Sequence, residues 1–125
     1  MKTDVSRVMI IVFDGLRPDF VHSELMPSLY EYAKNKAFEF RESSTVFPSV
    51  TRVATTSLIT GNYPRKHGII NNAFLQPNIF PNRVFDTSSF KMLEIAKKKY
   101  ANGLITTKTL GEYLSEAGKK FFSIH

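Results

Sequence analysis

Two residues of the chain stand where a protein could hold a metal ion or a phosphoryl group, and the first is Asp14. It follows an unbroken apolar run over residues 8–13 and precedes Gly15. In open α/β sheets the ligand crevice lies outside the carboxyl ends of the strands, so a carboxylate there reaches a ligand while the strand fixes its position. The simpler alternative is that Asp14 only caps the turn through its own backbone.

The second candidate is Thr51, in the sequence Phe-Pro-Ser-Val-Thr-Arg at residues 47–52. The pattern predicts a loop that enters a helix, and a helix N-terminus stabilises a phosphoryl group through its N–H groups and its dipole. A threonine hydroxyl is a good nucleophile only when a base or a metal lowers its pKa, and no base is near in sequence. Asp14 and Thr51 make sense together as two ligands of one metal ion. The alternative is that Thr51 or Ser49 is only an N-cap.

Other polar residues are weaker candidates. His67 lies in a turn with proline and glycine, where we interpret it as a structural hydrogen-bonding residue rather than a ligand. Asp19, His22 and Asp86 are isolated, with no spacing that indicates coordination. Because the chain has no cysteine, disulfides, thiolate metal sites and cysteine nucleophiles are excluded. Any metal must therefore be held by Asp, Glu, His or hydroxyl oxygen.

The elements that must position these residues indicate an α/β fold. Residues 8–13 predict a strand buried on both faces, as in a parallel sheet covered by helices. A helix is predicted to open at 26–28, with Leu29, Tyr32, Ala33 and Ala37 at helical spacing, and a strand follows at 38–41. A second helix is predicted at 51–60 and an irregular excursion at 62–86. The last predicted elements are a helix at 88–100 with Phe90, Leu93, Ala96 and Tyr100 on one face, a helix capped at 109–112 and a strand at 121–124. The first strand, helix and strand would form one β-α-β unit. Since the pattern supplies few strands, we expect the N-terminal piece of a larger α/β protein; the alternative is a compact three-stranded domain.

Composition excludes several classes of protein. The 125 residues are 42% hydrophobic with a net charge of +6, which is typical of a globular domain. The lysines are scattered apart from residues 97–99 and 119–120, and no nucleic-acid-binding motif accompanies them, so we expect a solvated surface and no nucleic-acid partner. No apolar run approaches the roughly 20 residues of a membrane-spanning helix, and no signal peptide is recognisable. We therefore expect a cytoplasmic location without a membrane.

Three segments, residues 11–19, 45–52 and 57–69, resemble the type I phosphodiesterase/nucleotide pyrophosphatase family of the alkaline phosphatase superfamily. The most specific stretch is T-G-x-Y-P-x-x-H-G-I at residues 60–69, and a weaker match covers residues 109–119. The resemblance implies that residues 1–125 are an N-terminal fragment of a single alkaline-phosphatase-like catalytic domain, with a sheet sandwiched by helices and left incomplete.

The resemblance also implies roles for individual residues. Asp14 would be a metal ligand, and Thr51, ten residues before the glycine of T-G-x-Y-P, would be both the nucleophile and a metal ligand. The complete site would hold two Zn²⁺ ions, with the remaining ligands outside the matched region. An asparagine three residues after the nucleophile would contact a phosphoryl oxygen, but Ala54 stands there.

The expected activity is therefore metal-dependent hydrolysis of phosphodiester or pyrophosphate bonds through a phosphothreonine, in the complete protein. The substrate would be a small phosphodiester, a nucleotide or a phosphonate. Two alternatives stay open. One is a phosphonoacetate-hydrolase-like activity, since that branch has a similar P-S-x-T order, found here at residues 48–51. The other is a non-catalytic fragment, because two ligands cannot hold two metal ions, and for this reason we expect the chain alone to be inactive.

Overall fold

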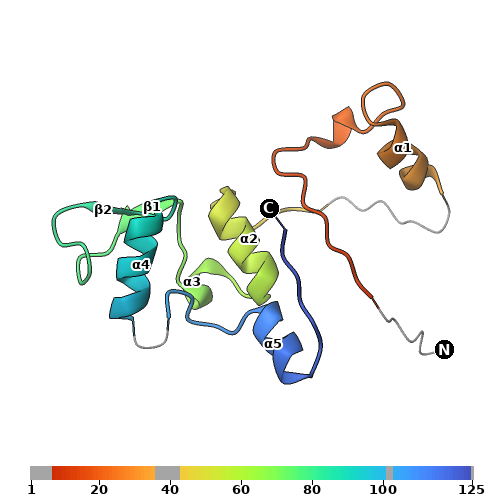
Figure 1. The fold of residues 1–125 in the computed structure, drawn as a ribbon. Helices are drawn as coiled ribbons and strands as arrows, with labels where there is room; N and C mark the ends of the chain where they lie inside the picture. Colours follow the sequence, from red (N-terminus) through yellow and green to blue (C-terminus); the bar gives the residue numbers. More distant parts are fainter. Residues whose placement is uncertain (1–6, 36–42, 101–102, 125) are drawn as a thin grey trace. The chain divides into compact units, whose positions relative to one another are not determined.

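The computed structural model describes residues 7–35, 43–100 and 103–124, which fall into two compact units, residues 1–43 and 44–125. The first unit holds a short 3-10 helix, η1 (Pro18–Phe20), and α1 (Pro27–Lys34). The second holds α2 (Thr51–Thr60), α3 (Pro64–His67), β1 (Ala73–Leu75), β2 (Val84–Asp86), α4 (Phe90–Lys99) and α5 (Leu110–Glu116), as labelled in Figure 1. The described part of the chain is thus a small α/β structure in which helices predominate.

The helix of the first unit begins where the sequence predicts. Pro27 is at the first turn of α1, where its missing N–H costs nothing and its fixed φ suits the helix. Leu29 and Ala33 are half-buried while Tyr32 is exposed. The predicted helical position Ala37 and the predicted strand at 38–41 lie outside the described residues.

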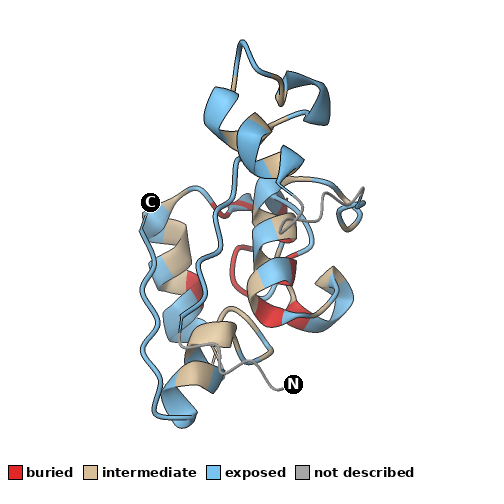
Figure 2. Ribbon diagram, turned by 90° about the vertical axis from the view of Figure 1, so that its right-hand side faces the viewer, coloured by how far each residue is buried: buried red, intermediate tan, exposed pale blue. Residues whose placement is uncertain are grey.

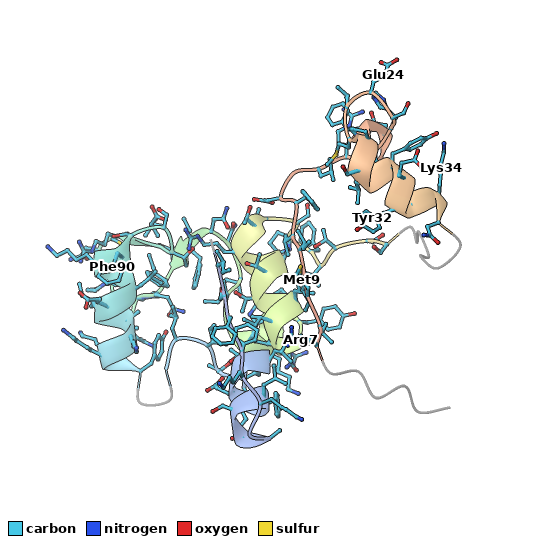
Figure 3. All side chains as sticks on the ribbon, turned by 45° about the vertical axis from the view of Figure 1, so that its right-hand side comes forward. Arg7, Met9, Glu24, Tyr32, Lys34 and Phe90 are labelled. Carbon is cyan, nitrogen blue, oxygen red and sulfur yellow. The ribbon has the colours of Figure 1, made fainter. Side chains whose placement is uncertain are left out.

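The predicted strand at residues 8–13 is not formed. The segment is extended but has no strand assignment, and its side chains are 51–83% exposed, with Met9 the most exposed. Met9 is labelled in Figure 3, and Figure 2 shows the whole segment in the colour of exposed residues. A strand is stabilised by ladder hydrogen bonds to a neighbour, and among the described residues only β1 and β2 are paired. The predicted β-α-β unit therefore lacks its first strand among the described residues, while its second strand, at 38–41, lies outside them.

The helix predicted at residues 51–60 is confirmed as α2. Its buried residues, Val53, Ser57 and Thr60, follow one another at intervals of four and three, which is the spacing of one helix face. Gly61 ends the helix with φ 63° and donates its N–H to the Ser57 carbonyl at 2.9 Å, because only glycine adopts this left-handed conformation without strain.

The stretch predicted to be irregular, residues 62–86, instead contains one helical turn and a sheet. α3 occupies its start, and β1 and β2 pair antiparallel with Phe74 opposite Phe85. Each strand has three residues with only the middle one buried, so the alternation was too short to stand out in the sequence. The prediction of a long irregular excursion is wrong for this segment.

The main apolar core of the second unit lies between this sheet and α4. It consists of five buried residues, Phe74, Ile79, Phe80, Phe85 and Ala96, with partly buried Met92, Leu93, Ile95, Tyr100 and Leu104 packed against them. The ring of Phe85 stacks on Phe80 and meets Phe74 edge-on, in both cases at 5.3 Å between centroids. Figure 1 shows α4 beside β1 and β2, in agreement with these contacts.

The helix predicted at 88–100 is confirmed as α4, with Ser89 as its N-cap. The predicted apolar face is correct for Leu93, Ala96 and Tyr100 but wrong for Phe90, which is 75% exposed and labelled in Figure 3. Met92 packs on the core instead, and its sulfur accepts the Asp86 N–H at 3.3 Å.

The predicted capping box at the start of α5 is confirmed. Thr109 Oγ1 accepts the Glu112 N–H, and the Glu112 carboxylate accepts the Thr109 N–H at 2.7 Å. This hydrogen bond from the Thr109 backbone, with a second from its hydroxyl, lowers the pKa of Glu112. Residues 121–124, predicted to be a strand, are extended and exposed without pairing, for the same reason as residues 8–13.

Among the described residues, no helix combines the length and the apolar character that crossing a membrane requires.

Candidate active site

Thr51 is the first residue of α2, and its side chain is exposed at the N-terminal end of the helix. The N-cap is Val50, whose apolar side chain makes no capping hydrogen bond. Neither Ser49 nor Thr51 therefore serves as the N-cap, and that alternative for Thr51 is wrong. Backbone N–H groups and the positive end of the helix dipole meet at this turn, an arrangement that favours a negatively charged group.

A distant asparagine caps α2 in place of a local residue. Asn72 Oδ1 accepts the N–H of Arg52 at 3.2 Å, although the two residues are 20 positions apart. The Asn72 carbonyl in turn accepts from Thr87, at 3.0 Å from its N–H and 2.6 Å from its hydroxyl. Thr87 is 2% exposed. The Asn72 backbone is thus anchored to a buried residue directly after β2.

Asp14 lies at the turn that follows residues 8–13, and Gly15 takes φ 73°, which favours glycine. The carboxylate is exposed, and it belongs to the first unit whereas Thr51 belongs to the second. No group of three His, Asp or Glu side chains able to hold a metal ion occurs among the residues that the structure describes. The pairing of Asp14 with Thr51 in one metal site stays a prediction.

The isolated polar residues make local contacts. Asp19 forms an exposed ion pair with Arg17 at 2.8 Å, and the ring of His22 accepts the Glu24 N–H at 3.4 Å. Asp86 accepts the Ser88 N–H at 2.8 Å. Hydrogen bonds from Ser88 lower the pKa of Asp86, and Arg52 adds a smaller electrostatic effect in the same direction.

His67 is fully buried and both ring nitrogens have partners. Nε2 lies 2.9 Å from Ser57 Oγ, and Nδ1 accepts the Ile69 N–H at 3.1 Å. Burial lowers the pKa of the ring below the ordinary value of 6.5, because a charged imidazolium is poorly solvated there. The structural interpretation of His67 is confirmed.

Comparison with known proteins agrees with the sequence motifs. The sequence model of the type I phosphodiesterase/nucleotide pyrophosphatase family matches residues 8–120. The chain belongs to this family. No solved structure matches it.

Three curated members of the family, or proteins named for the same activities, share part of the chain. A pyrophosphatase/phosphodiesterase described as uncharacterized, from Schizosaccharomyces pombe, is 37% identical over 73 residues, which are 58% of this chain and 15% of that protein. A bis(5'-adenosyl)-triphosphatase from Xenopus laevis is 36% identical over 71 residues, or 57% of this chain and 16% of the relative. A human ectonucleotide pyrophosphatase/phosphodiesterase family member is 26% identical over 77 residues, which are 62% of this chain and 16% of that protein. The matched part is therefore about one-sixth of the length of these relatives.

Asn72 could not be recognised as a site residue from the sequence. The resemblance to the family implies an asparagine on the nucleophile's own helix, and Ala54 stands there. An asparagine does reach the first turn of α2, but from the loop before β1. With Oδ1 occupied by the Arg52 N–H, the same amide still has two N–H donors at this end of the helix. The only signal in the sequence was the Asn-Asn pair at residues 71–72, which carries no spacing that links it to Thr51.

Thr55 is a poor substitute for such a donor. The Thr55 hydroxyl donates to the Thr51 carbonyl at 2.7 Å, so its proton points back along the helix. The Asn72 side chain, by contrast, lies at the first turn of α2, where its Oδ1 accepts the Arg52 N–H.

Proposed function

We propose that the protein is a metal-dependent hydrolase that cleaves phosphodiester or pyrophosphate bonds through a phosphothreonine on Thr51. The observation that carries this proposal is the exposed Thr51 at the first residue of α2, in a family member whose helix has no local side-chain cap there. A hydroxyl in that position lies in a field that attracts phosphate.

Asp14 and Thr51 have the chemistry of two zinc ligands. The Asp14 carboxylate and the Thr51 hydroxyl are exposed oxygen donors, and both would bind the same metal ion, the one that activates the nucleophile. We propose that the complete site holds two Zn²⁺ ions, with the other ligands in sequence outside residues 1–125. Bound zinc supplies positive charge that lowers the pKa of a hydroxyl or water and neutralises the phosphoryl oxygens.

Thr51 Oγ, after losing its proton to solvent, attacks phosphorus in line with the leaving group. The Oγ–P bond forms as the bond to the leaving oxygen breaks, and negative charge gathers on the nonbridging oxygens. The first-turn N–H groups of α2 other than that of Arg52, which donates to Asn72 Oδ1, and the amide N–H of Asn72 would donate to these oxygens, as an oxyanion hole does. Water then attacks phosphorus and releases a proton to solvent, the Oγ–P bond breaks, and Oγ takes up a proton so that the Thr51 hydroxyl is restored.

The test uses the protein at the length of its curated relatives, loaded with Zn²⁺ and given a chromogenic phosphodiester. Thr51→Ala removes the nucleophile and lowers kcat by at least about a thousandfold, since loss of a nucleophile leaves only the electrostatic contribution of the site. Thr51→Ser, which keeps a hydroxyl, retains measurable turnover. The matched control is Thr56→Ala, which removes a half-buried hydroxyl on the same helix, and it stays near the parent rate. Unchanged turnover in Thr51→Ala contradicts the proposal.

Substrate choice separates the proposal from its alternatives. A dinucleoside triphosphate is a natural probe because one relative is named for that activity, and a phosphonate is the second, because the P-S-x-T order at 48–51 favours it. Faster cleavage of the phosphonate supports the phosphonoacetate-hydrolase-like alternative. Tight stoichiometric binding of two Zn²⁺ ions by the 125-residue chain would contradict the alternative of a non-catalytic fragment. The cytoplasmic location stays a prediction, since two relatives are named ectonucleotide enzymes.

A further inference from the structure

Residues 67–72 run beside α2 and are fastened to it at both ends; we call this segment the strap. His67 at its start contacts Ser57 in the C-terminal half of the helix, with Nε2 2.9 Å from Oγ. Asn72 at its end contacts Arg52 in the first turn, with Oδ1 3.2 Å from the N–H. Because the order of contacts is reversed, the strap runs antiparallel to α2, and its two side-chain hydrogen bonds span most of the helix.

The strap is also held by residues outside α2. Thr106 donates its N–H to the His67 carbonyl at 3.2 Å and its hydroxyl to the Lys66 carbonyl at 2.6 Å. Thr87 holds the Asn72 carbonyl at the other end. Each end of the strap therefore joins α2 to a different part of the second unit.

The ring of His67 is the part of the strap that can titrate. Nδ1 accepts the Ile69 N–H, so Nδ1 carries a lone pair and the proton of the neutral ring is on Nε2, which donates to Ser57 Oγ. Protonation at Nδ1 would turn this acceptor into a donor, so that the Nδ1–H of His67 would face the Ile69 N–H. The Ile69 hydrogen bond would be lost and the strap would have to move.

No carboxylate on the described helices α2 and α3 compensates a buried imidazolium. The charged residues on the described elements packed against His67 are cations: Arg52 on α2, Arg65 and Lys66 on α3 itself, and Lys108 after the Thr106 contact. On α5, which packs on α2, the carboxylates of Glu112 and Glu116 bond Thr109 and Lys108. Burial alone lowers the pKa of His67, with no contribution from a charged neighbour.

We propose that residues 67–72 are a proton-sensitive strap that fixes the first turn of α2, and that His67 is its positioning residue. Neutral His67 holds the strap in register, and the strap holds Asn72 against the turn that carries Thr51. When His67 is protonated the strap opens, and Asn72 leaves that turn. The proposal rests on the proposed function only in treating this turn as catalytic.

The first test is amide hydrogen exchange of the full 125-residue chain, without metal or substrate, between pH 7.5 and pH 5. An open strap exposes His67, whose pKa is then near 6.5, whereas in the closed strap it is lower. The open state thus binds more protons, and protection is complete above pH 6.5 and falls as the pH decreases below it. After correction for intrinsic exchange, the opening constants of the Ile69 and Arg52 amides rise together, by up to about tenfold per pH unit. A flat profile at either amide overturns the proposal.

The second test uses variants that separate the two ring nitrogens at pH 7.5. His67→Asn keeps an acceptor near Nδ1 and loses the contact with Ser57, while His67→Gln keeps a donor near Nε2 and loses the acceptor for Ile69. If the two ends of the strap act together, both variants lower the hydrogen-exchange protection of the Arg52 amide by about threefold to tenfold, which is the effect of losing one typical hydrogen bond. Both also abolish the pH dependence. If Arg52 protection is unchanged while Ile69 protection falls, the two ends act independently and the proposal is wrong.

If the His67 variants fail to fold, Ser57→Ala tests the same contact, because it removes the hydroxyl that bonds His67 Nε2 and leaves the imidazole ring in place. It lowers Arg52 protection, whereas the control Ser115→Ala, at an exposed position on α5, does not. The Leu93 amide, bonded to the Ser89 carbonyl within α4, reports whether each variant is folded. Failure of the Thr51→Ala test would leave these exchange results unaffected, so the two proposals are separately falsifiable.

Discussion

Residues 8–13 and residues 73–86 both carry apolar side chains, yet only the second segment forms a sheet. The first is the more hydrophobic and contains no breaker, but its side chains are at least half exposed. The second contains prolines and asparagines, and still buries Phe74 and Phe85 at facing positions of β1 and β2. Apolar character is therefore a poor guide to which of these segments forms a strand.

The difference lies in the distance to a partner. β1 and β2 pair across a short connection within one segment, so little chain entropy is lost in bringing them together. A strand buried on both faces needs neighbours on both edges and helices on both faces, and among the described residues no strand pairs with 8–13. β-propensity expresses fit to a sheet that already exists.

The largest expected effect in this comparison is in the paired segment. Phe85→Ala removes a fully buried ring that packs on Phe74 and Phe80, and we expect it to lower the free energy of unfolding by about 3–5 kcal/mol. Urea unfolding of the chain measures this. Leu75→Ala, at a 69% exposed position of β1, is the control and changes stability by less than about 0.5 kcal/mol. Equal losses in the two variants would show that this sheet is not the core of the unit.

An intermediate effect is expected where the hairpin meets the strap. Thr87→Val keeps the shape of a buried side chain but removes the hydroxyl that donates to the Asn72 carbonyl, so we expect a loss of about 1 kcal/mol. The matched control is Thr107→Val, since the Thr107 hydroxyl is buried without a hydrogen-bond partner among the described residues. Thermal unfolding of that control should show unchanged or slightly higher stability. A greater loss from Thr107→Val than from Thr87→Val would contradict this account.

The smallest effect is expected in the unpaired segment. Ile10 is 59% exposed, so Ile10→Thr changes the unfolding free energy of the chain by less than about 0.5 kcal/mol. The same substitution at Ile79, which is 8% exposed, buries a hydroxyl and costs about 2 kcal/mol. If Ile10→Thr costs as much as Ile79→Thr in urea unfolding, residues 8–13 are packed in solution and the comparison fails.

Some features of the candidate site could be predicted from residues close in sequence, and others depend on residues far apart in sequence. Thr51 at a helix start and Gly61 at its end could be predicted because the signals for a helix and its termination lie within the segment itself. The contact of Asn72 with Arg52 could not, because it joins residues 20 positions apart through the path of the strap. His67 is intermediate: its structural role was predicted from its turn, but its partners Ser57 and Ile69 were not.

The sequence by itself determined the family, the positions of four of the helices and the two residues, Asp14 and Thr51, that are candidates for the chemistry. Local spacing, caps and motif order contain that information because they depend on neighbours a few residues away. Only the tertiary structure decided that residues 73–86 form a sheet and that Asn72 caps the helix of Thr51. Strand pairing and long-range capping depend on which distant groups the folded chain brings within hydrogen-bonding distance, and no local pattern records that choice.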